Sequence, residues 1–284
     1  MHCSLDDSPN YEALSYSWGD PGSTRPIILN DCPFLVTTNL ESALRHMRMS
    51  DSPKLLWIDA ICISQCDMEE KSHQVALMSQ IYRCAENVVI WLGPEREASA
   101  IGMEMLAFLS SDTAEPSNAP WATISPELCQ AGLQDIMSRT WFKRIWVVQE
   151  TALSQRATLM CGYRRVVWDN SPRRIRRFIR MIKYAEISPE WEQAGLKTID
   201  MNLLLQLLEM QGNQVLRSDT ALQTPDLLDV AHFMRNRHAA DPRDKILALL
   251  GISNDPNGAL RDFWPDYTLS YGETHKRLWR YLRN

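Results

Sequence analysis

Three acidic residues lie near the ends of stretches that contain aromatic residues, and these stretches are predicted strands or rich in tryptophan. Asp20 follows the alternating run 11–18, Asp59 lies late in the apolar run 55–65, and Glu150 ends the Trp-rich stretch 139–150. Because an unpaired buried carboxylate is costly, Asp59 should lie at the open carboxyl end of a strand or be held by neighbouring donors. The first arrangement predicts a ligand site, and the second predicts a structural carboxylate.

Motifs for other chemistries find little support in the sequence. There is no glycine-rich phosphate loop and no Gly-x-Ser-x-Gly nucleophile elbow. The histidines lack metal-ligand spacing, and His232 and His238 would lie on nearly opposite faces of one helix. Cys66 and His73 could form a nucleophile pair, but nothing local supports it. We therefore predict neither a metal site nor a bound cofactor.

The elements that must position these carboxylates form a strand, crossover helix and strand. The apolar runs 55–65 and 87–93 flank a segment of helical periodicity at 69–86, which predicts a mostly parallel α/β sheet. Asp67 with Glu70 is typical of a helix start. The residues predicted to line the buried face of this helix are Val75, Met78, Ile81, Tyr82 and Ala85.

Two hairpins and a helical end complete the predicted architecture. Residues 25–29 and 34–37 should form a hairpin that adds antiparallel strands to the sheet, and 156–161 with 165–168 should form another. From Ser171 onwards the pattern is mainly helical. We therefore expect an α/β domain at 1–168 and a helical extension at 169–284 that packs on it.

Composition places the chain among ordinary globular proteins. Its 284 residues carry a formal net charge of -5, which argues against a nucleic-acid binder overall. The start has no secretory signal pattern, and no apolar run approaches the roughly twenty residues that span a bilayer. These features predict an intracellular protein, and its seven scattered cysteines should be reduced and mostly buried.

Several of these segments, in fixed order, resemble the signature motifs of the fungal heterokaryon incompatibility (HET) domain. They lie at 11–20, 56–63, 74–82, 91–93 and 141–150, and further segments at 241–251 and 265–267 are similar to regions that follow the domain in many members. Two departures are small: Ser64 stands where an asparagine is usual, and little chain precedes the first strand.

The resemblance implies a cytoplasmic protein of fungal non-self recognition whose HET domain triggers regulated cell death. It also implies a remote relation to Toll/interleukin-1 receptor (TIR) domains, which are flavodoxin-like and in several lineages cleave NAD+. Enzymatic TIR domains carry a catalytic glutamate four residues after a tryptophan, and Trp146 with Glu150 reproduces that spacing. Four residues is one helical turn, so the indole and the carboxylate could share a face.

On this basis we predict that Glu150 is a catalytic carboxylate for NAD+ cleavage. Trp18, Gly19, Asp20, Asp59 and Trp146 should line the substrate cleft. One carboxylate would suffice, because cleavage of the nicotinamide bond builds positive charge on the ribose and needs no metal.

Three alternatives remain open at this stage. Glu150 could be paired structurally with Arg139, Lys143 or Arg144, with the tryptophans in the core. The chain could be a non-enzymatic module that signals by homo-oligomerisation or through a recognition partner protein. It could also have been recruited to another small-molecule reaction. The helical extension is a candidate restraint that limits access to Glu150.

Overall fold

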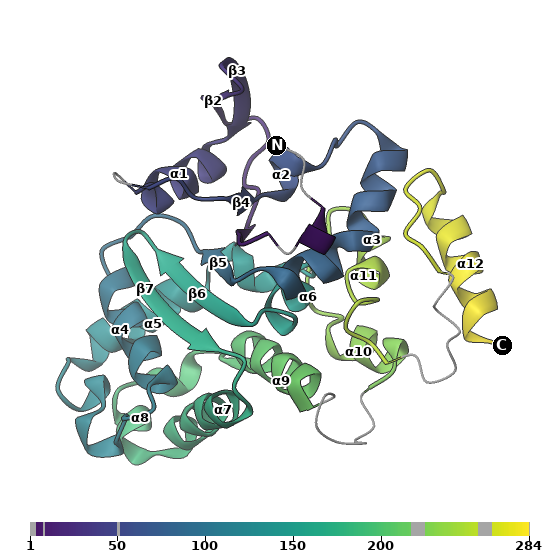
Figure 1. Cartoon of the computed structure of the whole chain (residues 1–284). Coiled ribbons are helices and arrows are strands. Elements are labelled where there is room, and N and C mark those ends of the chain that lie inside the picture. The colour runs from purple at the N-terminus through teal and green to yellow at the C-terminus, as the bar shows by residue number, and fades with distance from the viewer. Residues whose placement is uncertain (1–3, 8, 50–51, 217–224, 255–262, 284) are drawn as a thin grey trace.

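The computed structural model describes residues 4–7, 9–49, 52–216, 225–254 and 263–283, and a five-stranded sheet lies at its centre (Figure 1). Neighbouring strands are parallel except for the last pair, which is antiparallel. In sheet order the strands are β4 (Leu56–Trp57), β1 (Glu12–Tyr16), β5 (Asn87–Trp91), β6 (Arg156–Cys161) and β7 (Arg164–Asp169). The predicted mostly parallel α/β sheet is therefore confirmed. Numbered along the chain, these strands run 2-1-3-4-5, the order of flavodoxin-like folds.

The first strand of the predicted crossover unit is shorter than the sequence suggests. Of the predicted strand 55–65, only β4 pairs with the sheet. The short helix α2, Asp59–Cys62, follows where the apolar pattern predicted a continuation of the strand. The amides of Ile61 and Cys62 both donate to the Ile58 carbonyl, so the chain turns into a helix directly after the strand. A short apolar run does not by itself distinguish the two conformations.

The crossover helix α3, Met68–Cys84, forms as predicted. The Asp67 carboxylate caps it by accepting the amides of Glu69 and Glu70, each at 3.0 Å. The Glu70 carboxylate accepts the Ser64 amide at 3.2 Å, so the start is a simple cap and not the reciprocal pair that the sequence suggested. The predicted apolar side chains are buried in the main core.

Alternation along the strands produces a core on each face of the sheet. Val88, Ile90 and Leu92 belong to a large cluster that extends into the C-terminal helices. Val89 and Trp91 belong to a smaller cluster under α1, Thr38–Met47. Because successive side chains of a strand point to opposite faces, the fully buried strand β5 contributes to both cores.

The first hairpin forms, but its predicted addition to the main sheet is wrong. β2, Thr24–Leu29, and β3, Cys32–Thr37, pair only with each other and project from the body of the molecule (Figure 1). Their two-residue turn has both φ values positive, at Asn30 and Asp31, which matches the twist of an isolated hairpin. The outward side chains of this hairpin are consequently exposed.

Helices pack around the remaining faces and continue to the C-terminal end. α7 packs against α9, and α9 packs against α6. Ser270 and Glu273 form the predicted capping box of the last helix. These helices are α4 (Ser99–Ser110), α5 (Pro126–Met137), α6 (Val147–Ala152), α7 (Pro172–Ile187), α8 (Pro189–Gln193), α9 (Asn202–Leu216), α10 (Leu227–Phe233), α11 (Asp244–Leu247) and α12 (Tyr271–Leu282).

Two chain-wide expectations can be compared with the described residues. The prediction that the cysteines are mostly buried is wrong, because Cys129 and Cys161 are buried while Cys32, Cys62, Cys66 and Cys84 are exposed. Within the described ranges no helix is long and apolar enough to cross a membrane.

Candidate functional site

The candidate site is built at the carboxyl end of β1. Strand alternation directs Ser15 to the face that α6 covers and Tyr16 to the face that α1 covers. The neighbouring central strand, β5, ends beside β1, and the chain continues from β1 into the loop that carries Trp18. This point is where the strand order reverses, and open α/β sheets bind ligands there.

Glu150 lies on the α6 side of this edge and is 2 % exposed. The Ser15 hydroxyl donates to Glu150 Oε2, and Trp141 Nε1 donates to Ser15 Oγ at 2.7 Å. Burial raises the pKa of Glu150 from 4.5 to about 7, while Arg144 and the Ser15 hydrogen bond act in the opposite direction. The carboxyl group is therefore close to half-ionised at neutral pH.

Asp59 lies at the same edge, as the first residue of α2. Trp18 Nε1 donates to its Oδ2 at 2.8 Å, and the Ala60 amide donates to its Oδ1 at 2.7 Å. The Tyr16 hydroxyl also lowers the pKa of Asp59. Burial raises the pKa of Asp59, and the positive charge of Arg144 lowers it. The expected position at the strand mouth and the expected neighbouring donors are thus both present.

Arg144 links the two carboxylates electrostatically. Its Nη1 donates to the Tyr16 carbonyl at the end of β1, and its charge lowers the pKa of both Asp59 and Glu150. The negative charge of Asp59 in turn raises the pKa of Glu150. We refer to Ser15, Asp59, Arg144 and Glu150 as the carboxylate cluster.

The other predicted cleft residues fall into two groups. Trp18 joins the cluster through Asp59 and is 38 % exposed, so its ring is open to a ligand. Gly19 and Asp20 shape the adjoining loop: Gly19 has a φ of 81°, and Asp20 Oδ1 accepts the Gly22 amide at 2.9 Å. Gly19 is required there because an L side chain rarely adopts this φ and its Cβ would approach Asn39.

Trp146 has its side-chain hydrogen-bond partner outside the carboxylate cluster. Its carbonyl accepts the Glu150 amide at 3.2 Å, which confirms the one-turn spacing. Its indole Nε1, however, donates to Asp244 Oδ2 at 3.0 Å, in the C-terminal region. Although Trp146 and Glu150 are one helical turn apart, their side chains bond different partners: Trp146 bonds Asp244, and Glu150 bonds Ser15.

Sequence reasoning missed Ser15, Tyr16 and Trp141, and treated Arg144 only as a possible ion-pair partner of Glu150. The alternating pattern of β1 was the available signal, since a serine in an otherwise buried strand needs a polar partner. Arg139, another suggested partner of Glu150, forms an ion pair with Asp135 at 2.9 Å instead.

Comparison with known proteins identifies the family. Residues 11–150, which include the whole carboxylate cluster, match the family described as heterokaryon incompatibility protein (HET).

The chain is a HET-domain protein.

It is similar to "Heterokaryon incompatibility protein 6, OR allele" of Neurospora crassa, with 30 % identity over 316 aligned positions. That alignment covers 94 % of this chain and 46 % of the relative, so the chain spans about half of that protein's length. No solved structure matches the chain significantly.

The C-terminal region holds the last motif of the HET domain in place. Arg237 Nη1 donates to the Phe142 carbonyl at 2.5 Å, and the Ile145 amide donates to the His238 carbonyl at 2.8 Å. With the Trp146–Asp244 bond, three successive contacts fix the stretch that leads to Glu150. The position of Glu150 thus depends on residues beyond the matched region.

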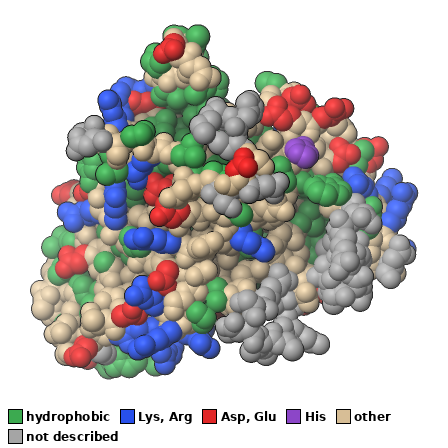
Figure 2. All heavy atoms as spheres, in the orientation of Figure 1, with side chains coloured by type: hydrophobic (Ala, Val, Ile, Leu, Met, Phe, Trp, Pro, Cys, Tyr) green, Lys and Arg blue, Asp and Glu red, His purple; other side chains and the backbone are tan. Residues whose placement is uncertain are grey.

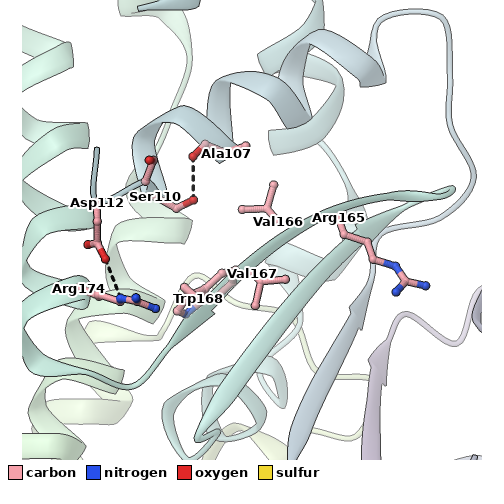
Figure 3. A pocket seen from close by; sticks show the side chains of 9 residues that line it. Ala107, Ser110, Asp112, Arg165, Val166, Val167, Trp168 and Arg174 are labelled. Atoms are coloured by element: carbon pink, nitrogen blue, oxygen red, sulfur yellow. Dashed lines mark hydrogen bonds and ion pairs between the residues drawn. The ribbon is translucent and has the colours of Figure 1, made fainter. Parts of the chain in front are cut away.

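A cavity of about 300 Å³ lies between α4 and the end strand β7 (Figure 3). Val166 points into the space beside Ala107, while Arg165 points away from it (Figure 3). Arg174 and Asp112 form an ion pair at 2.8 Å along the wall. None of the carboxylates predicted from the sequence lines this cavity, so it is separate from the carboxylate cluster of the HET domain.

Proposed function

We propose that this HET-domain protein acts in the cytoplasm in fungal non-self recognition and regulated cell death, and that Glu150 is its reactive group, cleaving NAD+. The observation that carries the proposal is a buried carboxyl group beside the point where the strand order reverses, and burial there raises its pKa to about 7. The heterokaryon incompatibility relative supports the biological role.

The chemistry asked of the site is cleavage of one glycosidic bond. The bond between the ribose C1′ and the nicotinamide nitrogen breaks, its electron pair leaves with nicotinamide, and positive charge develops on the ribose. The ionised Glu150 carboxylate stabilises that charge, and water then adds at C1′ to give ADP-ribose and a proton. We assign contacts with the nucleotide to Asp59 and to the ring of Trp18; the hydrogen bond between them and the 38 % exposure of Trp18 support this assignment.

Two properties of Glu150 constrain this mechanism. Only its ionised form stabilises the ribose cation, so turnover should rise as the pH increases through about 7. Glu150 is 2 % exposed, so a sugar reaches it only after the side chains that cover it rearrange. The described conformation therefore corresponds to a closed state of the proposed site.

Expression in a fungal host tests the proposed role. We expect induction of the wild-type chain to stop growth, and Glu150→Gln to restore growth to the rate of cells carrying an empty vector. Glu127→Gln is the matched control, because Glu127 is an exposed acid in the first turn of α5 and belongs to neither the carboxylate cluster nor the predicted cleft, and it should arrest growth like the wild type. A Glu150→Gln protein that accumulates equally and arrests growth equally would contradict a reactive role for Glu150.

Self-association without enzymatic activity is the second candidate function, and the β2–β3 hairpin favours it. Ile28 and Leu35 are 71 % and 65 % exposed, and hydrophobic side chains gather on this projection (Figure 2). Exposed apolar groups on a projecting hairpin are typical of an interaction surface. The buried and paired Glu150 would then be a structural carboxylate.

Sedimentation velocity checks the self-association candidate. If the hairpin forms the interface, the double variant Ile28→Ser with Leu35→Ser should weaken association at least about tenfold, since each buried aliphatic side chain contributes about 1.5–3 kcal/mol. Leu128→Ser, at an exposed position on α5, is the control and should not change it. A wild-type chain that stays monomeric at high concentration would exclude this candidate.

We further propose that residues 1–168 form the HET domain and residues 169–284 a helical extension that limits access to Glu150. The contacts of Arg237, His238 and Asp244 with the 142–146 stretch support this role. The two parts share one large hydrophobic cluster, so deletion of the extension would expose apolar core. Asp244→Ala, which removes the acceptor of both Trp146 and Tyr267 and keeps the extension, is therefore the cleaner way to test restraint.

A further inference from the structure

Gln149, the residue before Glu150, carries a buried polar group without a partner. Its side chain is 2 % exposed, and among the described residues Nε2 has no hydrogen-bond partner. Leaving such a donor unsatisfied costs about 1–3 kcal/mol, so buried donors of this kind usually meet a ligand, an ion or an ordered water.

The side chain of Gln149 lines a cavity of about 180 Å³ between the HET domain and the C-terminal region. Val75 and Ser79 of α3 form one wall, and Leu247 and Phe263 form the other. Most residues that line the cavity are apolar, and Gln149 contributes a buried polar side chain to the lining. A site of this kind combines an apolar body with a small number of orienting polar groups.

The polar end of the cavity is built around Gly251. A Cβ placed on Gly251 would lie 2.5 Å from the Ser79 Cβ, 2.7 Å from Gln149 Oε1 and 3.3 Å from Ser79 Oγ. A side chain at this position would therefore collide with both residues. Glycine at this position lets the backbone pack directly against Ser79 and Gln149, and all three residues line the cavity.

We propose that this cavity binds a small aromatic molecule that carries a carboxamide or a similar planar amide. The ring would occupy the space between Val75, Leu247 and Phe263, and its amide would pair with Gln149 and Ser79. The volume is adequate, since an apolar protein cavity of about 150 Å³ accommodates benzene. Such a ligand would contact α3, α6 and the C-terminal region at the same time, and α6 is the helix that carries Glu150.

Benzamide is the probe for this site, and toluene is the probe without the amide. Isothermal titration of the full chain should show saturable benzamide binding at millimolar concentration. Gln149→Met, which keeps the length and removes the donor, should weaken benzamide about fivefold to tenfold and leave toluene unchanged. Without ligand the variant should be at least as stable as the wild type, because the donor it removes has no partner.

A second readout uses the wild-type protein alone. The side-chain amide resonances of Gln149 in a nitrogen–proton correlation spectrum should move on addition of benzamide and stay in place with toluene. Failure of benzamide to bind, equal binding by Gln149→Met, or an ordered water that benzamide does not displace would each overturn the proposal. Clear destabilisation of unliganded Gln149→Met would show that the side chain has a structural partner, and would overturn it too.

Discussion

Replacing Glu150 by glutamine is expected to raise the free energy of unfolding at pH 8 by about 3 kcal/mol. Burial raises the pKa of Glu150 from 4.5 to about 7, so the folded protein holds a proton that the unfolded chain releases in this interval. The stability contributed by this group is complete below pH 4.5 and is lost as the pH rises through about 7. Glutamine stays neutral and keeps an oxygen that accepts the Ser15 hydroxyl.

Urea unfolding of both proteins at pH 5 and pH 8 measures this effect. The two should differ little at pH 5, and the variant should be the more stable at pH 8. Burial also raises the pKa of Asp59 and Asp244, but both remain in the variant, so their burial largely cancels in the difference between the two proteins. A variant that is less stable than the wild type at pH 8 would indicate that the ionised carboxylate has a stabilising partner.

This result would separate a functional carboxylate from a structural one. A structural acid is retained because its ionised form stabilises the fold, and its amide variant is destabilised. Glu150 is expected to behave in the opposite way, since its charge is a cost to stability. Residues that lower stability in this manner are characteristic of sites that need a strained or reactive group.

Arg237→Ala is expected to lower the free energy of unfolding by about 3–5 kcal/mol. The guanidinium is fully buried, and it donates to the Phe142 carbonyl at 2.5 Å and to the Leu203 carbonyl at 2.7 Å. Burial lowers its pKa to about 10, so it remains charged at neutral pH. Alanine leaves both carbonyls without this donor and opens a cavity between α9 and the Phe142 turn.

Thermal or urea unfolding of Arg237→Ala measures the loss. Arg235→Ala is the matched control, because Arg235 is exposed and donates only to the nearby His232 carbonyl, and it should stay within about 0.5 kcal/mol of the wild type. A loss below about 1 kcal/mol for Arg237→Ala would show that the contacts to Phe142 and Leu203 do not anchor the stretch.

Local patterns in the sequence predicted most of the elements of the fold. The cap at Asp67, the periodicity of α3, the hairpin of β6 with β7 and the capping box at Ser270 depend on residues within a few positions of one another. The extent of the strand before Asp59 and the free-standing β2–β3 hairpin were not predictable, because they depend on packing. Periodicity alone does not show whether a strand pairs with the main sheet.

The candidate site was predicted only in part for a similar reason. Asp59 and Glu150 were found because acids after apolar or aromatic stretches are conspicuous in a sequence. The Ser15 partner of Glu150 is 135 positions away, and the Asp244 partner of Trp146 is 98 positions away. The prediction that Trp146 and Glu150 are one helical turn apart is confirmed, yet their side chains bond different partners.

NAD+ consumption by the purified 284-residue chain tests the central claim most directly. Protein and NAD+ are incubated at pH 8, where Glu150 is mostly ionised, and nicotinamide and ADP-ribose are quantified for the wild type, Glu150→Gln and the control Glu127→Gln. We expect equal amounts of the two products from the wild type and from Glu127→Gln, and none above background from a folded Glu150→Gln. Intact NAD+ with the wild type at high protein concentration, or unchanged turnover by Glu150→Gln, would contradict the assignment of Glu150 as the reactive carboxylate.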